Sequence, residues 1–302
     1  MLNQTKDKLK KYLKIIESNF NINRLINEEQ QNKQIRDYYL TNHLAYLIFH
    51  NRKGFMHMGL SEDNKYSGDD LLGQLKIIQK YIDDMRAQQV LELGAGNGSN
   101  SLHLAKSNRS VNFIGIDLSK KLSTADISNY KQELGDFHNL NKYPDESFDL
   151  VFVIEALCHS THKNIVLKEV YKKLRKSGLF IIFDGYANKP LNQFTDEEAL
   201  AKKLTEKTMA VESFDFIDDF EKVIRKSNFS VIAKKDLSQE IMPSLKRFER
   251  LALLLYKFPP ITNLIKFFLP QDLVKNAVAG LLMPTLIERE IACYYLHVLK
   301  KK

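Results

Sequence analysis

The chain has 302 residues, of which 44% are hydrophobic and 27% charged, proportions that exclude a disordered or a membrane-spanning class. Its formal net charge of +8 comes largely from lysines spread over helical segments and both ends, so we expect a solvated surface and no nucleic-acid partner. Two distant cysteines, Cys158 and Cys293, indicate neither a disulfide framework nor a metal site. No signal-peptide-like or transmembrane run is present, so we expect a cytoplasmic protein.

The first 70 residues are expected to form an N-terminal helical lid. Apolar residues at three- and four-residue spacing predict helices over residues 1 to about 50, ended by a turn at 51–54. The polar stretch 61–70 predicts a loop, and residues 71–84 a helix.

From there, short β-rich runs alternate with helical segments, which is typical of a parallel sheet with helices on both faces. Strands are predicted at 90–93, 112–116, 150–154, 179–183 and 229–235. Helices are predicted after Gly98, after Ser119, over 163–175 and over 215–227. We expect Ser177-Gly178 to stop the third of these helices. The core is predicted to cover residues 71–237.

The apolar segment 238–288 is expected to be a helical cap inserted before the last strand. It contains five prolines, which are Pro243, Pro259, Pro260, Pro270 and Pro284. Because proline interrupts helices, we predict several short helices packed at angles. The strand-like run 291–299 then closes the sheet, so residues 289–302 return to the core.

The central signal is a glycine turn that follows the strand at 90–93. Gly94-Ala95-Gly96-Asn97-Gly98 allows the backbone to turn tightly and approach a ligand, and the next helix presents free N–H groups. A nicotinamide-dependent oxidoreductase could use the same turn, and this alternative stays open.

Three features of the context favour S-adenosylmethionine. Glu92 would repel a pyrophosphate but not a cationic methionyl group. Asp117 ends the next strand about 20 residues on, where a carboxylate can accept hydrogen bonds from both ribose hydroxyls. Ser99 stands where the dinucleotide pattern has its third glycine.

Five segments occur in the order of the motifs of class I S-adenosylmethionine-dependent methyltransferases: Glu92–Gly98, Gly115–Ser119, Gly135–Phe137, Ser147–Val151 and Leu174–Gly178. The chain resembles this family over about residues 85–185. The resemblance implies a Rossmann-like, seven-stranded α/β sheet with helices on both faces and S-adenosylmethionine as cofactor. Lys176-Ser177-Gly178 departs from the usual Lys-Pro-Gly-Gly and alters a turn.

The resemblance also implies a set of cofactor-binding residues. The glycines of the turn frame the methionyl part, Asp117 holds the ribose, and Leu118 flanks the adenine. Asp136 and Phe137 meet the edge and face of the adenine, although Asp136 could instead cap a local turn. The full predicted set is Glu92, Gly94, Ala95, Gly96, Asn97, Gly98, Asp117, Leu118, Gly135, Asp136, Phe137 and Glu155.

A narrower resemblance concerns the acceptor. The segment Val153–Ser160, with Glu155 and a Cys158-His159 pair, resembles the fourth strand of sterol and terpenoid C-methyltransferases. Residues 37–39 and 54–60 resemble the lid of a broader group that includes natural-product and phospholipid-base methyltransferases. Together they imply a small-molecule acceptor without fixing which one.

The candidate catalytic residues depend on the acceptor atom. The sulfonium methyl is already activated, so alignment and exclusion of water matter most. For a hydroxyl or amine, His159 or His57 is the candidate base. For an alkene or activated carbon, Tyr38, Tyr39 and Glu155 could face the developing cation, although adjacent tyrosines diverge on a helix. Structural roles remain open: Glu155 in the cofactor loop, His159 at a helix start and His57 beneath the lid.

The cap has several uses that the sequence leaves open. Its apolar residues favour a lipophilic acceptor such as a lipid, terpenoid or sterol-like compound, but they also suit core packing or a homodimer contact. Its lysines and arginines suit a peripheral membrane contact. A methyltransferase-like protein that binds ligand without turnover is a further alternative.

Overall fold

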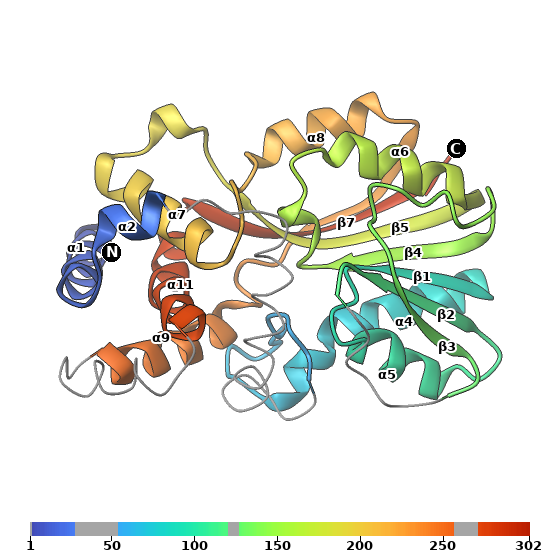
Figure 1. The fold of residues 1–302 in the computed structure, drawn as a ribbon, viewed down its shortest axis with the longest axis horizontal. Helices are drawn as coiled ribbons and strands as arrows, with labels where there is room; N and C mark the ends of the chain where they lie inside the picture. Colours follow the sequence, from blue (N-terminus) through green and yellow to red (C-terminus); the bar gives the residue numbers. More distant parts are fainter. Residues whose placement is uncertain (1, 28–53, 120–126, 257–270) are drawn as a thin grey trace.

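The computed structural model describes residues 2–27, 54–119, 127–256 and 271–302, and its centre is a seven-stranded sheet (Figure 1). The strand order is β3-β2-β1-β4-β5-β7-β6. Strands β1 to β5 are parallel to one another, and β7 is antiparallel to β5 and β6. The bounds are β1 Gln89–Leu93, β2 Asn112–Asp117, β3 Tyr130–Leu134, β4 Phe148–Ile154, β5 Leu174–Ala187, β6 Phe229–Asp236 and β7 Ala292–Lys301. The predicted fold class is confirmed.

Helices cover both faces of this sheet (Figure 1). Helices α4 (Gly73–Met85) and α5 (Ser99–Ser107) pack on one face, and α6 (Lys163–Lys173) and α8 (Ile217–Lys226) pack on the other. Because side chains alternate along a strand, Val90 faces α4 and α5 whereas Leu91 and Leu93 face the opposite layer. Short 3₁₀ helices in the described ranges are η2 Gly68–Leu72, η3 Leu157–His159 and η4 Leu191–Gln193.

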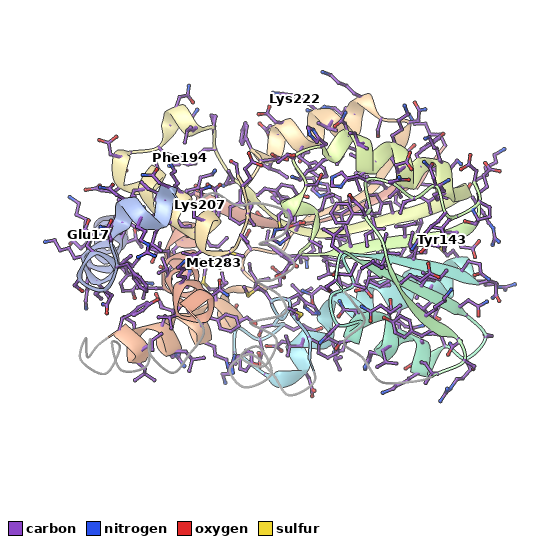
Figure 2. All side chains as sticks on the ribbon, in the orientation of Figure 1. Glu17, Tyr143, Phe194, Lys207, Lys222 and Met283 are labelled. Carbon is purple, nitrogen blue, oxygen red and sulfur yellow. The ribbon has the colours of Figure 1, made fainter. Side chains whose placement is uncertain are left out.

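A second group of helices packs together beyond one end of the sheet. This group has its own apolar core. In Figure 2 the labels Glu17, on α1, and Met283, on α11, show where the group lies. Its members come from three parts of the chain: α1 Leu2–Asn19, α2 Ile22–Asn27, α7 Asp196–Thr208, α9 Met242–Tyr256 and α11 Gln271–Glu288. The sequence did not predict α7, although Thr195 and Glu198 form a capping box at its start.

Two predictions about helix ends and breaks are wrong. Helix α6 ends at Lys173, and Gly178 does not stop it, because Leu174 already pairs with Phe148 of β4 and residues 175–178 bulge out of β5. Pro284 lies inside α11 and does not break that 18-residue helix. Pro243 stands in the first turn of α9, where a missing N–H costs little.

Several predictions lie outside the described residues. These are the helix after Ser119, Pro259, Pro260, Pro270, Tyr38 and Tyr39. Within the described ranges, no helix combines the length and the apolar character needed to cross a membrane.

Packing in the helical group can be tested at Leu204 of α7. This side chain is 0% exposed, so Leu204→Ala leaves a cavity and should lower the free energy of unfolding by about 2–5 kcal/mol, measured in urea. The matched change Leu191→Ala, at a side chain 68% exposed, should alter it by less than about 0.5 kcal/mol. Equal effects of the two substitutions would contradict the packing.

Candidate active site

The glycine turn lies between β1 and α5, and its glycines serve different purposes. Gly94, Gly96 and Gly98 have φ of 65°, 55° and 82°, in the left-handed region that side chains disfavour. A Cβ on Gly94 would lie 2.4 Å from the Cβ of Ala156, and one on Gly98 would lie 2.1 Å from Oη of Tyr130. A Cβ on Gly96 would meet only Sδ of Met56, at 3.4 Å. Gly96 is therefore the glycine that borders open space.

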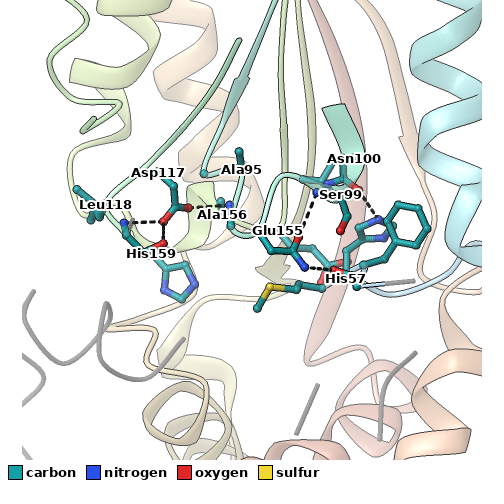
Figure 3. Close-up of a pocket in the computed structure, with 17 residues that line it drawn as sticks. His57, Ala95, Ser99, Asn100, Asp117, Leu118, Glu155, Ala156 and His159 are labelled. Carbon is teal, nitrogen blue, oxygen red and sulfur yellow. Dashed lines mark hydrogen bonds between the residues drawn. The ribbon is translucent and has the colours of Figure 1, made fainter. Parts of the chain in front are cut away.

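A cleft of about 730 Å³, its open mouth included, lies beside this turn (Figure 3). It stands at the carboxyl ends of β1, β2 and β4, where ligands of open α/β sheets bind. Four segments line it: residues 54–57, residues 94–97 with Ser99 and Asn100, residues 117–119, and residues 154–156 with His159.

Asp117 joins β2 to the glycine turn. Its Oδ2 accepts a hydrogen bond from Gly96 N at 2.8 Å, and its Oδ1 accepts bonds from N and Oγ of Ser119 at 2.9 and 2.6 Å. The carboxylate therefore fixes the turn while it borders the cleft. Each carboxylate oxygen can accept more than one hydrogen bond, so the carboxylate of Asp117 can accept further hydrogen bonds from a ligand in the cleft.

Residues 54–60 form the opposite wall and are bonded to the core at several points. Nδ2 of Asn97 donates to Gly54 O at 2.6 Å, and Gly59 N donates to Oγ of Ser244 at 3.0 Å. Met58 is bonded through both backbone groups: its N–H donates to Oε1 of Glu155 at 2.8 Å, and its carbonyl accepts from Nε2 of Gln74 at 2.7 Å. These bonds hold the wall against the cofactor side of the cleft.

Glu155 follows β4 directly and has a φ of 51°, which is uncommon for a residue with a side chain and typical of functional sites. Its Oε1 accepts hydrogen bonds from Met58 N and, at 2.9 Å, from Oη of Tyr294. Burial raises the pKa of Glu155 to about 8, against the lowering effect of these two bonds, and nearby Asp184 adds to the rise.

The two histidines of the cleft differ in their bonding. Nδ1 of His159 donates to Ala210 O at 3.0 Å, which selects the neutral tautomer with its lone pair on Nε2. Burial lowers the pKa of His159, so the ring is neutral at pH 7. His57 has its Nδ1 3.0 Å from Met58 O and its Nε2 3.1 Å from Oδ1 of Asn100, so both nitrogens face protein atoms.

Comparison with known proteins identifies the family. A methyltransferase domain model matches residues 91–182, the strands and turn that border the cleft. An O-methyltransferase, cnsE, of Penicillium expansum is 26% identical over 209 residues, covering 65% of this chain and 72% of the relative. A 24-methylenesterol C-methyltransferase of Arabidopsis thaliana is 24% identical over 160 residues, covering 50% and 44%. Residues 91–182 of the chain therefore form a methyltransferase domain, and its sequence relatives are methyltransferases.

A solved methyltransferase shares the fold. The geranyl diphosphate C-methyltransferase of Streptomyces coelicolor, crystallised with S-adenosyl-L-homocysteine, superposes with a TM-score of 0.62 at 11% identity, over 89% of this chain and 97% of the other. The shared fold and the methyltransferase domain of residues 91–182 agree with S-adenosylmethionine as the cofactor.

The cleft fits that cofactor. Gly96 leaves room where a side chain would project, and Asp117 presents carboxylate oxygens that can accept bonds from ribose hydroxyls. Glu155 adds a second carboxyl group to the cleft. Two carboxyl groups oppose a pyrophosphate and attract a cationic sulfonium, so the chemistry of the cleft agrees with S-adenosylmethionine.

The structure brings most predicted site residues of the methyltransferase together. Those that line the cleft are Gly94, Ala95, Gly96, Asn97, Asp117, Leu118, Glu155, His57 and His159. Those that do not line it are Glu92, Gly98, Gly135, Asp136 and Phe137. The last three follow β3 at the sheet edge, and their contact with adenine stays a prediction.

Glu92 requires a correction, because it points away from the cleft and under α5. Its Oε2 accepts bonds from N and Oγ of Ser101 at 3.1 and 2.6 Å, and its Oε1 accepts from Nδ2 of Asn100 at 2.9 Å. A carboxylate at this place stabilises the start of the helix. Burial raises the pKa of Glu92 to about 7.

Asp136 makes the local hydrogen bonds expected of a carboxylate that caps a turn. Its Oδ1 accepts from His138 N at 2.8 Å and lies 2.7 Å from Nδ1 of the same histidine.

Sequence reasoning missed three residues that organise the cleft: Asn100, Gln74 and Tyr294. Gln74 and Tyr294 lie outside the matched segment, and no local motif marks them.

Gly96 and Gly98 provide a matched test. Alanine at either position costs about 1–2 kcal/mol of stability, because both have left-handed φ. Gly98→Ala should cost more, since its methyl meets Tyr130, and adding Tyr130→Phe should recover part of the loss. Gly96→Ala should instead weaken S-adenosylhomocysteine binding, measured by calorimetry. A Gly96→Ala protein with unchanged affinity would contradict the assignment of the cleft.

Proposed function

We propose that this methyltransferase transfers the methyl group of S-adenosylmethionine to a small lipophilic acceptor, such as a terpenoid, sterol-like compound, lipid or other natural product, with His159 as the base. The observation that supports it best is the convergence of Asp117, the glycine turn, Glu155 and His159 on one cleft. Cofactor-binding and proton-accepting groups thus border the same space.

The apolar side chains of the cleft support a lipophilic acceptor. Phe55 and Met56 border it from the wall of residues 54–60, and Ile154 and Ala156 border it from the end of β4. The relatives named above act, by their names, on a sterol and on geranyl diphosphate. Burial of an apolar acceptor against these side chains contributes about 25 cal/mol per Å² of apolar surface removed from water.

The chain's own groups then perform four tasks. When bound, S-adenosylmethionine supplies an electrophilic methyl group on a positively charged sulfur. Asp117 and the glycine turn orient it, and residues 54–57 exclude water. Nε2 of His159 accepts the proton that a hydroxyl or amine acceptor loses as the new bond to the methyl carbon forms. Glu155 counters positive charge in the cleft, since a nearby cation favours its ionised form.

We assign the role of base to His159 and keep His57 as the alternative. The hydrogen bond from Nδ1 of His159 to Ala210 O makes Nε2 the basic nitrogen of that ring. The positive charge lost at sulfur reappears on the imidazole, so the net charge of the buried site does not change during transfer. In low-dielectric surroundings a step that leaves the net charge unchanged costs less than one that creates an unpaired charge.

Cofactor binding tests the proposal first. The protein should bind S-adenosylmethionine and S-adenosylhomocysteine in calorimetric titrations, and Asp117→Ala should weaken both by about tenfold or more, because it removes charge-assisted hydrogen bonds. Glu62→Ala, at an exposed carboxylate outside the cleft, is the control and should bind as the wild type does. A protein that bound NADH and neither adenosyl compound would refute the proposal.

The base can be tested once an acceptor is found. Incubation with S-adenosylmethionine carrying a CD₃ group, against lipophilic alcohols, amines and alkenes, should give a product 17 mass units heavier by mass spectrometry, the arithmetic of CD₃ replacing H. His159→Gln should lower kcat by about 10²–10⁴ while leaving S-adenosylhomocysteine affinity unchanged. Because burial lowers the pKa of His159, the wild-type rate should fall only at pH values below the usual histidine range. An unchanged kcat in His159→Gln would exclude it as the base.

A further inference from the structure

Tyr294 and Gln74 are buried polar residues outside the segment that matches the family model. Tyr294 lies in β7 and is 3% exposed, and Gln74 lies in the first turn of α4 and is 0% exposed. Burial of polar groups is costly unless they are hydrogen-bonded, so the bonds of these two side chains are informative.

Their side chains form a closed ring of hydrogen bonds with Glu155 and Met58, which we call the Glu155 latch. Nε2 of Gln74 donates to Met58 O at 2.7 Å and to Oη of Tyr294 at 3.4 Å. Oη of Tyr294 donates to Oε1 of Glu155 at 2.9 Å, and Met58 N donates to the same oxygen at 2.8 Å. Each N–H or O–H in the ring meets an acceptor, whereas Oε1 of Gln74 is buried without a hydrogen-bond partner among the described residues.

The position of Tyr294 is itself fixed by its backbone. Tyr294 N donates to Oγ of Ser238 at 2.9 Å, and Tyr294 O accepts from Leu237 N at 2.7 Å. The neighbouring Ser244 accepts a bond from Gly59 N. The hydroxyl of Tyr294 is therefore held at one point relative to the sheet.

The latch leaves one carboxyl oxygen of Glu155 for the cleft. Both bonds go to Oε1, and among the described residues neither a hydrogen bond nor an ion pair involves Oε2. Glu155 lines the cleft, so Oε2 is the oxygen that can meet a ligand. The left-handed backbone at Glu155 is a strained state that such surrounding contacts can maintain.

We infer that Tyr294, supported by Gln74, is a positioning residue of the methyl-transfer site that directs the Glu155 carboxyl into the cleft and fixes residues 54–60 across it. This inference rests on the proposed function, because it gives Glu155 a cationic cofactor to face. Tyr294 and Gln74 act through Glu155 and Met58 and touch neither reactant.

Tyr294 also affects the charge of Glu155. A hydrogen bond donated to a carboxylate favours the ionised form, whereas burial and the carboxyl of Asp184 on β5 oppose it. Asp117, His57 and His159 are the other titratable side chains that line the same cleft, and burial lowers the pKa of both histidines. Loss of the Tyr294 hydroxyl should therefore raise the pKa of Glu155 above its present value of about 8.

The test compares Tyr294→Phe with Tyr295→Phe. Tyr295 is the next residue of β7 and packs on the opposite face of the sheet, so its variant removes a hydroxyl without touching the latch. In the unliganded protein, amide hydrogen exchange of residues 54–60 should be about tenfold faster in Tyr294→Phe, since one charge-assisted bond is lost. Tyr295→Phe should exchange as the wild type does.

Binding at different pH values gives a second measurement that a purely structural role would not change. S-adenosylmethionine carries a positive sulfur that S-adenosylhomocysteine lacks, so the ratio of their affinities reports the charge on Glu155. In the wild type this ratio should rise with pH as Glu155 ionises, and in Tyr294→Phe the midpoint should move to higher pH. Tyr295→Phe should keep the wild-type midpoint.

Gln74→Met provides an independent variant. It removes the bond to Met58 O but keeps the bond from Tyr294 to Glu155, so it should speed exchange of residues 54–60 while leaving the midpoint near that of the wild type. If Tyr294→Phe does not fold, faster exchange in Gln74→Met supports the inference and unchanged exchange overturns it.

Wild-type exchange and a wild-type midpoint in folded Tyr294→Phe would overturn the inference. A wild-type protein that binds neither adenosyl compound would instead refute the proposed function. The exchange comparison, made without cofactor, would still decide whether the latch fixes residues 54–60.

Discussion

The hydrogen bond from Gly96 N to Asp117 is the interaction on which the site depends. It ties the turn after β1 to the end of β2, and it holds Gly96 in a left-handed conformation beside the cleft. Below the turn, Glu92 bonds the start of α5 and fixes where the helix begins. Two carboxyl groups thus hold the turn from opposite sides, and only Asp117 also borders the ligand space.

Acidic groups around the cleft create a site whose charge responds to its ligand. Asp117 and Glu155 are the carboxyl groups that line the cleft, and burial raises the pKa of Glu155 to about 8, so Glu155 exchanges a proton near neutral pH. A cation entering the cleft favours the ionised form of Glu155, and its departure favours the protonated form. In the proposed function, methyl transfer would neutralise the sulfur of bound S-adenosylmethionine, and the attraction of Glu155 for the spent cofactor would then weaken.

The sequence predicted those features that local pattern determines. β1, the glycine turn and Asp117 are encoded by an apolar run, glycines and a carboxylate at fixed spacing, and the structure has them in place. The role of Glu92 was misjudged even though strand alternation points to the answer: it shares a face with Val90, which packs under α4 and α5.

Other features depend on contacts between distant parts of the chain, and no local pattern reports them. β3 reads Tyr-Lys-Gln-Glu-Leu and lies at the sheet edge, where polar residues replace the apolar run of a central strand. Pro284 stays helical because tertiary packing outweighs the local cost of proline in α11. Gln74 and Tyr294 are 220 residues apart, yet their side chains meet, so neither could be selected without the fold.

The two halves of the cleft have different origins in the chain. The segment that matches the family model supplies the glycine turn, Asp117, Glu155 and His159, which line the cleft. The opposite wall comes from residues 54–60, and it is held by Gln74 of α4, Ser244 of α9 and Tyr294 of β7. Because these supports lie outside the motifs, substitutions there can change the wall of residues 54–60 while the glycine turn and Asp117 stay constant. Glu155 is the contact between the halves, since one of its oxygens joins the wall and the residue itself ends a strand of the core.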